Sequence, residues 1–494
     1  MIKVNSELRE RLVNASRRSI LSGGVGLGAL ALLQLSRAGQ AISATPAIKA
    51  SPAALTDKGI LGAGKFPARA KRVLHIMMWG GMSQCDTFDY KPTLVKMHGK
   101  ELPPSVRQKG GRVSTMSGAQ SSFPCIAPAA SFHQYGESGA WVSDLLPAIG
   151  EIIDEFTVVR SMYTEHVNHD PAAKFLHTGF QLSGRPSAGA WVNYALGSDN
   201  ANLPSFVAMC SGGQGGVGVD ASAWSSGFLP SHHQGVLFGD GADPVLYVSS
   251  PEGIDKEGRR AQLDVLHKIA NAQTRLSNDP EIASKMTQYE MAYRMQESVP
   301  DVVDLASEPA HVIGAYGPDV VIPGTFARNC VLARRLLERD VKFVQLMHTG
   351  WDAHSFLQRS IAYSCQQVDQ PIAALVSDLK QRGLLEDTLV VISTEFGRTA
   401  FAQGQFDSNS YGRDHHGPCF TYLLAGAGVK AGHVYGETDE FSYNIASNPV
   451  HIHDMQATML YLLGIDHELL TYHYQGRDFR LTDVAGKVVK GILA

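Results

Sequence analysis

Six short apolar runs, spread over most of the chain, constrain its fold more than any other feature. Each is a nearly continuous stretch of Val, Ile, Leu, Met and aromatic residues, which is typical of a strand buried on both faces. Longer helical segments separate several of the runs, and strands that alternate with helices predict βαβ units in a mostly parallel sheet. The predicted strands cover residues 72–79, 156–160, 203–209, 341–347, 388–393 and 419–425.

The segments between these strands predict the helices of the same domain. No internal repeat is visible, so we expect one α/β domain over residues 69–494 with helices on both faces of its sheet. Residues 205–330 interrupt the simple alternation, and we interpret them as an insertion that caps the functional site. The predicted helices begin and end near residues 169–177, 256–276, 279–297, 326–338, 355–382 and 453–463.

Polar side chains gather at the ends of three predicted strands. In an open α/β sheet, ligands bind at the carboxyl ends of the strands. Carboxylates and imidazoles that meet there suit a divalent metal ion such as zinc, manganese or calcium. One cluster alone would be ordinary loop polarity, whereas three at equivalent positions favour a site. The clusters are Asp352 with His354 after residues 341–347, Glu395 with Arg398 after residues 388–393, and His415 with His416 just before residues 419–425.

The residue types in these clusters suggest individual roles. Asp352 and His354 are two residues apart, so on an extended segment both face the same side and can reach one ion. Glu395 could hold a second ion or act as a base. Arg398 offers a planar fork for phosphate, sulfate or carboxylate oxygens, so we expect it to bind an anionic group. The sequence does not distinguish His415 from His416 as the ligand.

Two further candidates lie nearer the N-terminus. His169 stands at the expected start of the helix at residues 169–177, where an anion would also be held. Its imidazole could be a nucleophile, a metal ligand or a general acid or base, and the commonness of imidazole as a ligand favours the last two roles. Asp86 is the nearest carboxylate after the first strand, which makes it a candidate metal ligand.

The first 44 residues have the features of an export signal. Arg17 and Arg18 form a twin-arginine pair, a mildly apolar stretch covers residues 20–35, and small residues follow. The chain is therefore expected to meet the Tat translocase and to become periplasmic or extracellular. Residues 45–68 have no periodicity and are expected to form a linker, and no other segment is long and apolar enough to span a membrane.

Charge and cysteine usage exclude two classes of site. The net charge of −4 and the absence of a basic cluster argue against nucleic acid as a partner. Six cysteines are scattered without a Cys-x-x-Cys pair, which argues against a thiolate zinc site.

Four segments resemble an uncharacterised bacterial family called domain of unknown function fifteen-hundred-and-one. The family is similar to the alkaline phosphatase and sulfatase superfamily, and the resemblance covers roughly residues 70–490. It implies a three-layer, alkaline-phosphatase-like α/β fold with a mostly parallel central sheet. The matching segments are residues 80–92, 394–399, 413–416 and 476–483.

The wider superfamily implies a metal-dependent site with some departures in this chain. Asp352, His354 and one of His415 and His416 take the places of the first metal's ligands. Glu395 fills the position of the Asp in the second Asp-His pair. The departures are Phe396 at the second pair's His, Trp79 at the Asp that usually ends the first strand, and His169 at the nucleophile.

The resemblance and the clusters together predict an exported, metal-dependent hydrolase of phosphate or sulfate esters. The ion would polarise the ester oxygen and lower the pKa of a bound water. The alternative is a catalytically inactive, sulfatase-like protein that serves as a secreted binding or assembly protein, and the changes at Trp79 and Phe396 favour it.

Overall fold

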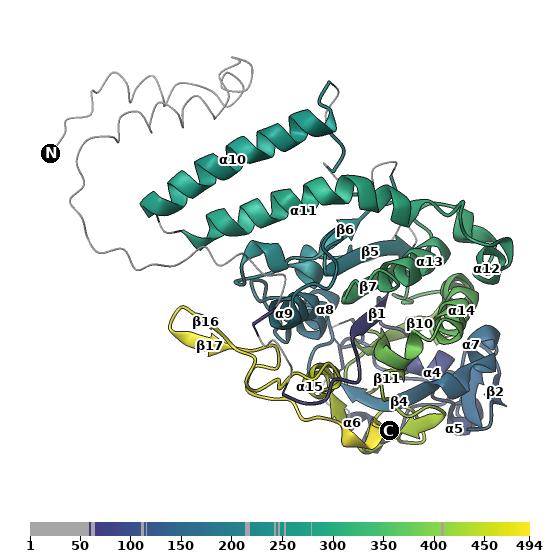
Figure 1. The fold of residues 1–494 in the computed structure, drawn as a ribbon. Coiled ribbons are helices and arrows are strands. Elements are labelled where there is room, and N and C mark those ends of the chain that lie inside the picture. The colour runs from purple at the N-terminus through teal and green to yellow at the C-terminus, as the bar shows by residue number, and fades with distance from the viewer. Residues whose placement is uncertain are drawn as a thin grey trace, which may run out of the picture. The chain divides into compact units, whose positions relative to one another are not determined.

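A nine-stranded mixed sheet forms the centre of the part of the chain that the computed structural model describes (Figure 1). This part belongs to the unit Leu55–Ala494. The expected export signal, most of the linker and residues 213–217 lie outside the described residues. The structure describes residues 59–60, 65–109, 113–114, 116–212, 218–241, 244–245, 248–250, 253–277, 279–406 and 410–494.

The sheet is mostly parallel, as the apolar runs predict. β11 runs antiparallel to its neighbours β4 and β8, and every other pairing along the sheet is parallel. In spatial order the strands are β12 (His433–Tyr435), β4 (Phe156–Tyr163), β11 (Phe420–Ala425), β8 (Thr388–Ser393), β1 (Arg72–Trp79), β7 (Phe343–Thr349), β5 (Phe206–Gly212) and β6 (Val236–Phe238), with β15 (Val450–His451) beside β4.

Both faces of the sheet are covered by helices, which explains why the central strands are apolar throughout. Alternate residues of β1 enter two separate cores, since Leu74 and Ile76 pack on one side and Val73 and Met77 on the other. Full burial of a side chain of this size contributes roughly 1.5–3 kcal/mol. One core includes residues of α7 (Pro147–Glu151), α13 (Phe326–Leu337) and α14 (Leu357–Gln381), and the other includes residues of α8 (His169–Thr178), α9 (Ala188–Leu196) and α15 (Ile452–Leu462).

The direction of β11 brings segments that precede and follow strands to one edge of the sheet. β1, β7, β8 and β4 all end at their shared carboxyl edge. Because β11 is antiparallel to β8 and β4, its beginning lies at this same edge. The residues just before Phe420 therefore meet those just after Thr349 and Ser393.

Two short antiparallel strands, which were not predicted from the sequence, bring the residues before Phe420 to this edge. β9 (Gly397–Gln403) and β10 (Gly412–His416) pair with each other, and His415 lies opposite Arg398. Neither segment is among the six predicted strands, because polar residues interrupt its apolar character. Every residue of β10 is nevertheless buried.

The predicted insertion at residues 205–330 is too wide. β5 and β6 fall inside this range, yet they continue the central sheet from β7. The remaining part contains a helical hairpin, α10 (Lys256–Ser277) and α11 (Pro280–Val303), on the β6 side of the sheet (Figure 1). α11 packs on α13 and on the turn at Ser231–His233, so the structure gives no support for a cap over the carboxyl edge at β1 and β7.

An ion network joins the two helices of this hairpin and predicts a pH dependence. Arg260 donates to Glu290 from two nitrogens, at 2.7 and 2.9 Å, and the His267 Nε2 lies 2.7 Å from the same carboxylate. The hydrogen bond from Arg260 is the main cause that lowers the pKa of Glu290 to about 2. The stabilisation is therefore present above the pKa of a free Glu, about 4.3, and is lost as the pH falls towards 2.

We expect Glu290→Gln to loosen α10 at pH 7 and to have a smaller effect at pH 3, where only part of the stabilisation remains. The effect should be below about 1 kcal/mol because the network is partly exposed to solvent. Hydrogen exchange of α10 amides in wild-type and variant protein, compared at each pH, measures it. Equal protection of the two proteins at pH 7 would contradict the expectation.

The described part of the expected linker contacts the domain, since the Phe66 amide donates to Gly464 O at 3.2 Å. Among the described residues, no helix combines the length and apolar character needed to cross a bilayer. The other elements are α4 (Gln84–Thr87), α5 (Pro92–Lys96), α6 (Pro104–Lys109), β2 (Phe132–Tyr135), β3 (Ala140–Ser143), α12 (Ala310–Ala315), β13 (Glu437–Thr438), β14 (Ile445–Ser447), β16 (Tyr472–Tyr474) and β17 (Arg477–Phe479).

Candidate metal centre

Four side chains from three distant segments converge at the carboxyl edge of the sheet. Their ligand atoms all lie within 4.8 Å of one another, and the group is able to hold a metal ion. His169 begins α8, which follows β4. Asp352 and His354 lie in the loop after β7, and His415 lies in β10.

One carboxylate oxygen is the meeting point of the three imidazoles. The Nε2 atoms of His169, His354 and His415 lie 3.2, 2.8 and 3.2 Å from Oδ1 of Asp352. In the described structure, the Nε2 of His169 is buried without an aligned hydrogen-bond partner. A buried nitrogen of this kind is an available ligand atom.

The opposite nitrogen of each imidazole faces a hydrogen-bond acceptor. Each Nδ1 therefore carries the proton, and in a neutral ring the Nε2 lone pair points into the cluster. Metal-binding histidines are usually oriented by such contacts. The three pairs are His169 with Glu395 Oε1 at 2.6 Å, His354 with Gln403 Oε1 at 2.5 Å, and His415 with the carbonyl oxygen of Val167 at 2.7 Å.

Glu395 orients His169, and its predicted role as a metal ligand or base stays a prediction. It lies outside the four-residue group. Its side chain is fully buried, and both of its oxygens accept from the amide of Gly80, at 2.9 and 3.2 Å. Gly80 has φ +123°, and a Cβ there would lie 2.6 Å from the amide nitrogen of Asp352. Only glycine lets β1 end so close to this loop.

Arg398 positions Asp352, and its predicted role in binding an anionic substrate stays a prediction. Its side chain is fully buried, and Nη2 donates to Oδ1 of Asp352 at 2.6 Å. The guanidinium also donates to carbonyl oxygens of Gly80, Gly81, Trp351 and Arg413. These contacts hold it against Asp352 and the surrounding backbone.

Asp86 lies outside the cluster, so the structure does not bring this predicted ligand together with the other four residues. It forms a fully buried ion pair with Arg413, whose Nε donates to Oδ2 at 2.7 Å and whose Nη2 donates to Oδ1 at 3.1 Å. The Ser83 hydroxyl and the Ala129 amide donate to the same carboxylate. This brace holds β10, and therefore His415, against the segment after β1.

His416 points away from the cluster, which resolves the open choice between the two histidines. Neighbouring residues of a strand face opposite sides, so only one of the pair can face Asp352. The Nε2 of His416 lies 2.6 Å from the carbonyl oxygen of Tyr443, and its ring stacks on Tyr443 at 4.1 Å. Of the two candidates, the structure places His415 and not His416 in the cluster.

The electrostatics of the cluster favour a bound positive charge. Burial raises the pKa of Asp352, but hydrogen bonds from the three imidazoles and the charge of Arg398 outweigh burial and hold this pKa well below its usual range. Burial lowers the pKa of His169, yet its bonds to Asp352 and Glu395 raise it overall to about 9. Burial lowers the pKa of His415 to about 4. Asp352 is therefore an anion at every working pH.

The donor set fits a borderline transition metal. Three imidazole nitrogens and one carboxylate oxygen suit zinc or manganese, whereas calcium takes oxygen ligands almost exclusively. Of the three ions expected from the sequence, calcium fits this donor set least, and the identity of the ion stays a prediction. The side chains of Asp352 and His354 are 23% and 21% exposed, against 9% for His169 and 5% for His415. The open side of the centre is thus the side of the loop after β7.

Two of the three groups that orient the imidazoles could not be predicted from the sequence. Gln403 ends β9, and nothing in its sequence context marks it as a partner of His354. The carbonyl oxygen of Val167 belongs to the backbone and has no signature in the sequence. Only Glu395 among the three orienting groups had a signal, as a carboxylate after an apolar strand.

The fold and the cluster define an α/β protein with a buried His-Asp group at the carboxyl edge of a mostly parallel sheet. The chain belongs to the DUF1501 family, described as proteins of unknown function, whose model matches residues 70–493. This confirms the family expected from the sequence. No curated protein matches the chain.

Several solved structures are similar to this chain at low identity. A lipoteichoic acid synthase, LtaP, from Listeria monocytogenes is 10% identical over 84% of this chain and 76% of that chain, with a TM-score of 0.34. A phosphonate monoester hydrolase from Silicibacter pomeroyi is 12% identical over 85% and 76%, with a TM-score of 0.34. An alkaline phosphatase superfamily protein from Vibrio parahaemolyticus is 11% identical over 89% and 77%, with a TM-score of 0.31. Similarity at such low sequence identity and TM-score does not assign an activity to the chain.

Proposed function

We propose that this protein is an exported hydrolase of phosphate or sulfate esters that depends on one divalent metal ion, zinc or manganese. One observation carries the proposal: three histidines, each held through Nδ1, direct Nε2 at a single oxygen of Asp352. Export by the Tat route and a periplasmic or extracellular location are part of the same proposal and rest on Arg17 and Arg18.

The residues of the centre have separable tasks. Asp352, His169, His354 and His415 would hold the ion, and Arg398 and Glu395 fix the orientation of Asp352 and His169. A divalent ion bound there supplies Lewis-acid polarisation of the ester oxygen and a lowered pKa for a bound water. The ester would approach from the exposed side of Asp352 and His354.

Charge supports an anionic substrate. Asp352, Glu395 and Arg398 together carry one net negative charge, so a divalent ion leaves one net positive charge in a buried setting. A phosphate or sulfate oxygen is attracted to such a centre more strongly than a neutral ester. Since Arg398 is fully buried and bonded to Asp352 and to backbone carbonyl oxygens, the ion itself would be the main anchor for that oxygen.

Removal of the ion should abolish turnover. We expect a chelator to lower the hydrolysis of aryl phosphate or aryl sulfate esters at least about 100-fold, because the ion supplies several kcal/mol of charge stabilisation. Zinc or manganese should restore the rate, and calcium should not. Initial rates with a panel of phosphate monoesters, phosphate diesters and sulfate esters measure this, and undiminished turnover by metal-free protein would contradict the proposal.

The second candidate is a metal-stabilised binding or assembly protein without catalysis. It is favoured by the full burial of Arg398 and by its hydrogen bonds to Asp352 and to backbone carbonyl oxygens, which hold it away from a substrate. Metal content and ester hydrolysis, measured on the same protein, distinguish the two candidate functions. Protein that contains one ion per chain and hydrolyses no ester in the panel would support the second candidate over the first.

A further inference from the structure

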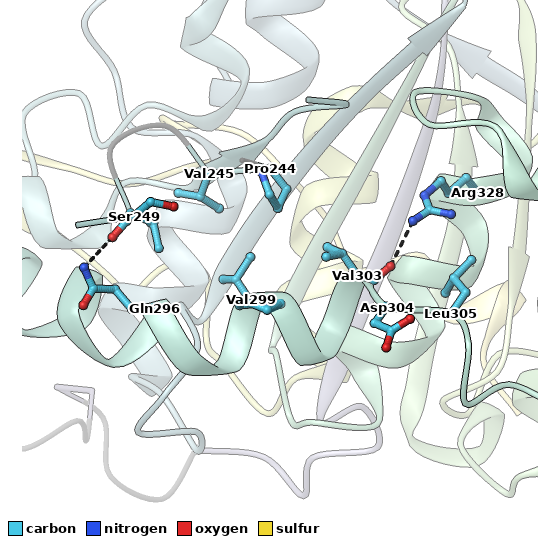
Figure 2. A pocket seen from close by; sticks show the side chains of 11 residues that line it. Pro244, Val245, Ser249, Gln296, Val299, Val303, Asp304, Leu305 and Arg328 are labelled. Carbon is cyan, nitrogen blue, oxygen red and sulfur yellow. Dashed lines mark hydrogen bonds between the residues drawn. The ribbon is translucent and has the colours of Figure 1, made fainter. Parts of the chain in front are cut away.

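A pocket of about 410 Å³ lies between α11, the first turn of α13 and the residues that follow β6 (Figure 2). Its volume falls in the range of small-molecule sites. Aliphatic side chains form its middle, with Val245 on one side and Val299 and Val303 of α11 on the other, and polar side chains line the rest (Figure 2). None of the residues of the metal centre lines it.

The pocket lies at the same edge of the sheet as the metal centre. β6, β5 and β7 are parallel, so the segments that follow them leave the sheet together. The Nδ2 of Asn329 donates to the carbonyl oxygen of Cys210 near the end of β5 at 3.0 Å. The ring of Phe326 lies 5.0 Å from that of His348, near the end of β7. The first turn of α13 is thereby fixed at the edge where ligands of open α/β sheets bind.

A single cation stands at one end of this apolar pocket. Arg328 uses Nη2 to donate to the carbonyl oxygen of Val303 at 2.9 Å, as the dashed line in Figure 2 shows. In the described part of the chain, this is the one hydrogen bond of its side chain, and the guanidinium forms no ion pair within 4.0 Å. A guanidinium has five N–H donors in a fork that matches a carboxylate. Most of its donors therefore remain available.

The other polar groups restrict the charge that a bound ligand can carry. Asp304 also lines the pocket, and its Oδ1 accepts from the amide of Ala306 at 2.9 Å. Its negative charge disfavours a multiply charged anion such as a phosphate monoester. At the far end, Gln296 is occupied because its Nε2 donates to Val248 O at 2.6 Å. The pocket thus offers one anchor for one negative charge and an aliphatic channel beside it.

The length of the channel sets the size of the ligand. Gln296 and Val303 are separated by seven residues of α11, which corresponds to about 10 Å along a helix axis. This is the reach of an extended chain of about eight carbons. We propose that the pocket is a binding site for an aliphatic monocarboxylate of medium chain length, with the carboxylate on Arg328 and the chain between Val245 and Val299.

Octanoate binding to the full, metal-loaded protein tests the proposal, with octanol as the uncharged analogue. Isothermal titration should give octanoate at least about tenfold tighter binding than octanol, which is the size of one charged hydrogen-bonded pair. Arg328→Gln should weaken octanoate at least about tenfold and leave octanol unchanged. Arg328→Lys should restore most of the affinity, because it keeps the positive charge.

Arg359→Gln is the matched control, since Arg359 is an exposed arginine on α14, and it should change neither affinity. Metal content should be the same in wild type, Arg328→Gln, Arg328→Lys and Arg359→Gln. The titration measures binding and not turnover, so its result does not depend on the proposed hydrolysis. Octanoate that binds no tighter than octanol, an affinity unchanged in Arg328→Gln, or no octanoate binding to wild-type protein would each overturn the proposal. The comparison of octanoate with octanol on wild-type protein decides it even if a variant fails to fold.

Discussion

Replacing His354 with Ala is expected to lower the affinity of the protein for its metal ion at least about 100-fold. His354 provides one of the four ligand atoms of the cluster, and loss of an outer-shell partner alone typically costs 10–100-fold. The side chain is 21% exposed and its hydrogen-bond partner is Gln403, so the variant should still fold. Equilibrium competition against a chelating dye measures the change.

His473→Ala is the control for this variant. His473 lies in β16 with a side chain that is 68% exposed, and it is outside the metal cluster. Its metal affinity should equal that of the wild type. If His354→Ala retained the wild-type affinity while circular dichroism showed a native fold, the convergence of the three imidazoles would not be a metal site.

Replacing Arg413 with Met is expected to lower the free energy of unfolding by about 3–5 kcal/mol. The change leaves the carboxylate of Asp86 buried without its cation, and breaking a buried pair in this way costs about that amount. Both side chains are fully buried, and Arg413 also donates to the carbonyl oxygen of Thr399. Urea unfolding followed by tryptophan fluorescence measures the loss.

Two further proteins separate the ion pair from a general effect of the substitution. Arg359→Met, at an exposed position of α14, should change stability by less than about 0.5 kcal/mol. The double variant Asp86→Asn with Arg413→Met should be less destabilised than the two single changes added together, because the residues contact each other. A loss below about 1 kcal/mol for Arg413→Met would show that the brace does not stabilise the fold.

The central strands were predictable because of their burial. β1 and β8 are apolar along their whole length since each face of the sheet packs on a helical layer. The bounds predicted for these two strands agree with the structure. β9 and β10 were not predicted, because their buried arginines and histidines resemble loop residues until their partners are known.

The candidate site was predictable only in part, for a related reason. Asp352 and His354 could be paired from their spacing, which is a local property of the chain. Contacts between distant segments carry no such signal. Arg413 and Asp86 are 327 residues apart. Only the folded chain shows that Asp86 forms an ion pair with Arg413. Likewise, the direction of the β10 side chains, which selects His415 over His416, depends on the bulge between Arg413 and His415 in its pairing with β9.

Anomalous X-ray scattering from crystals of protein purified without chelator tests the metal centre most directly. Data collected on either side of the absorption edge of zinc or manganese locate the element that is present. We expect one anomalous peak per chain, coordinated by His169, His354, His415 and Asp352, the four residues that the structure brings together. Full-length protein with no anomalous peak among these four side chains, or with its ion bound elsewhere, would contradict the account.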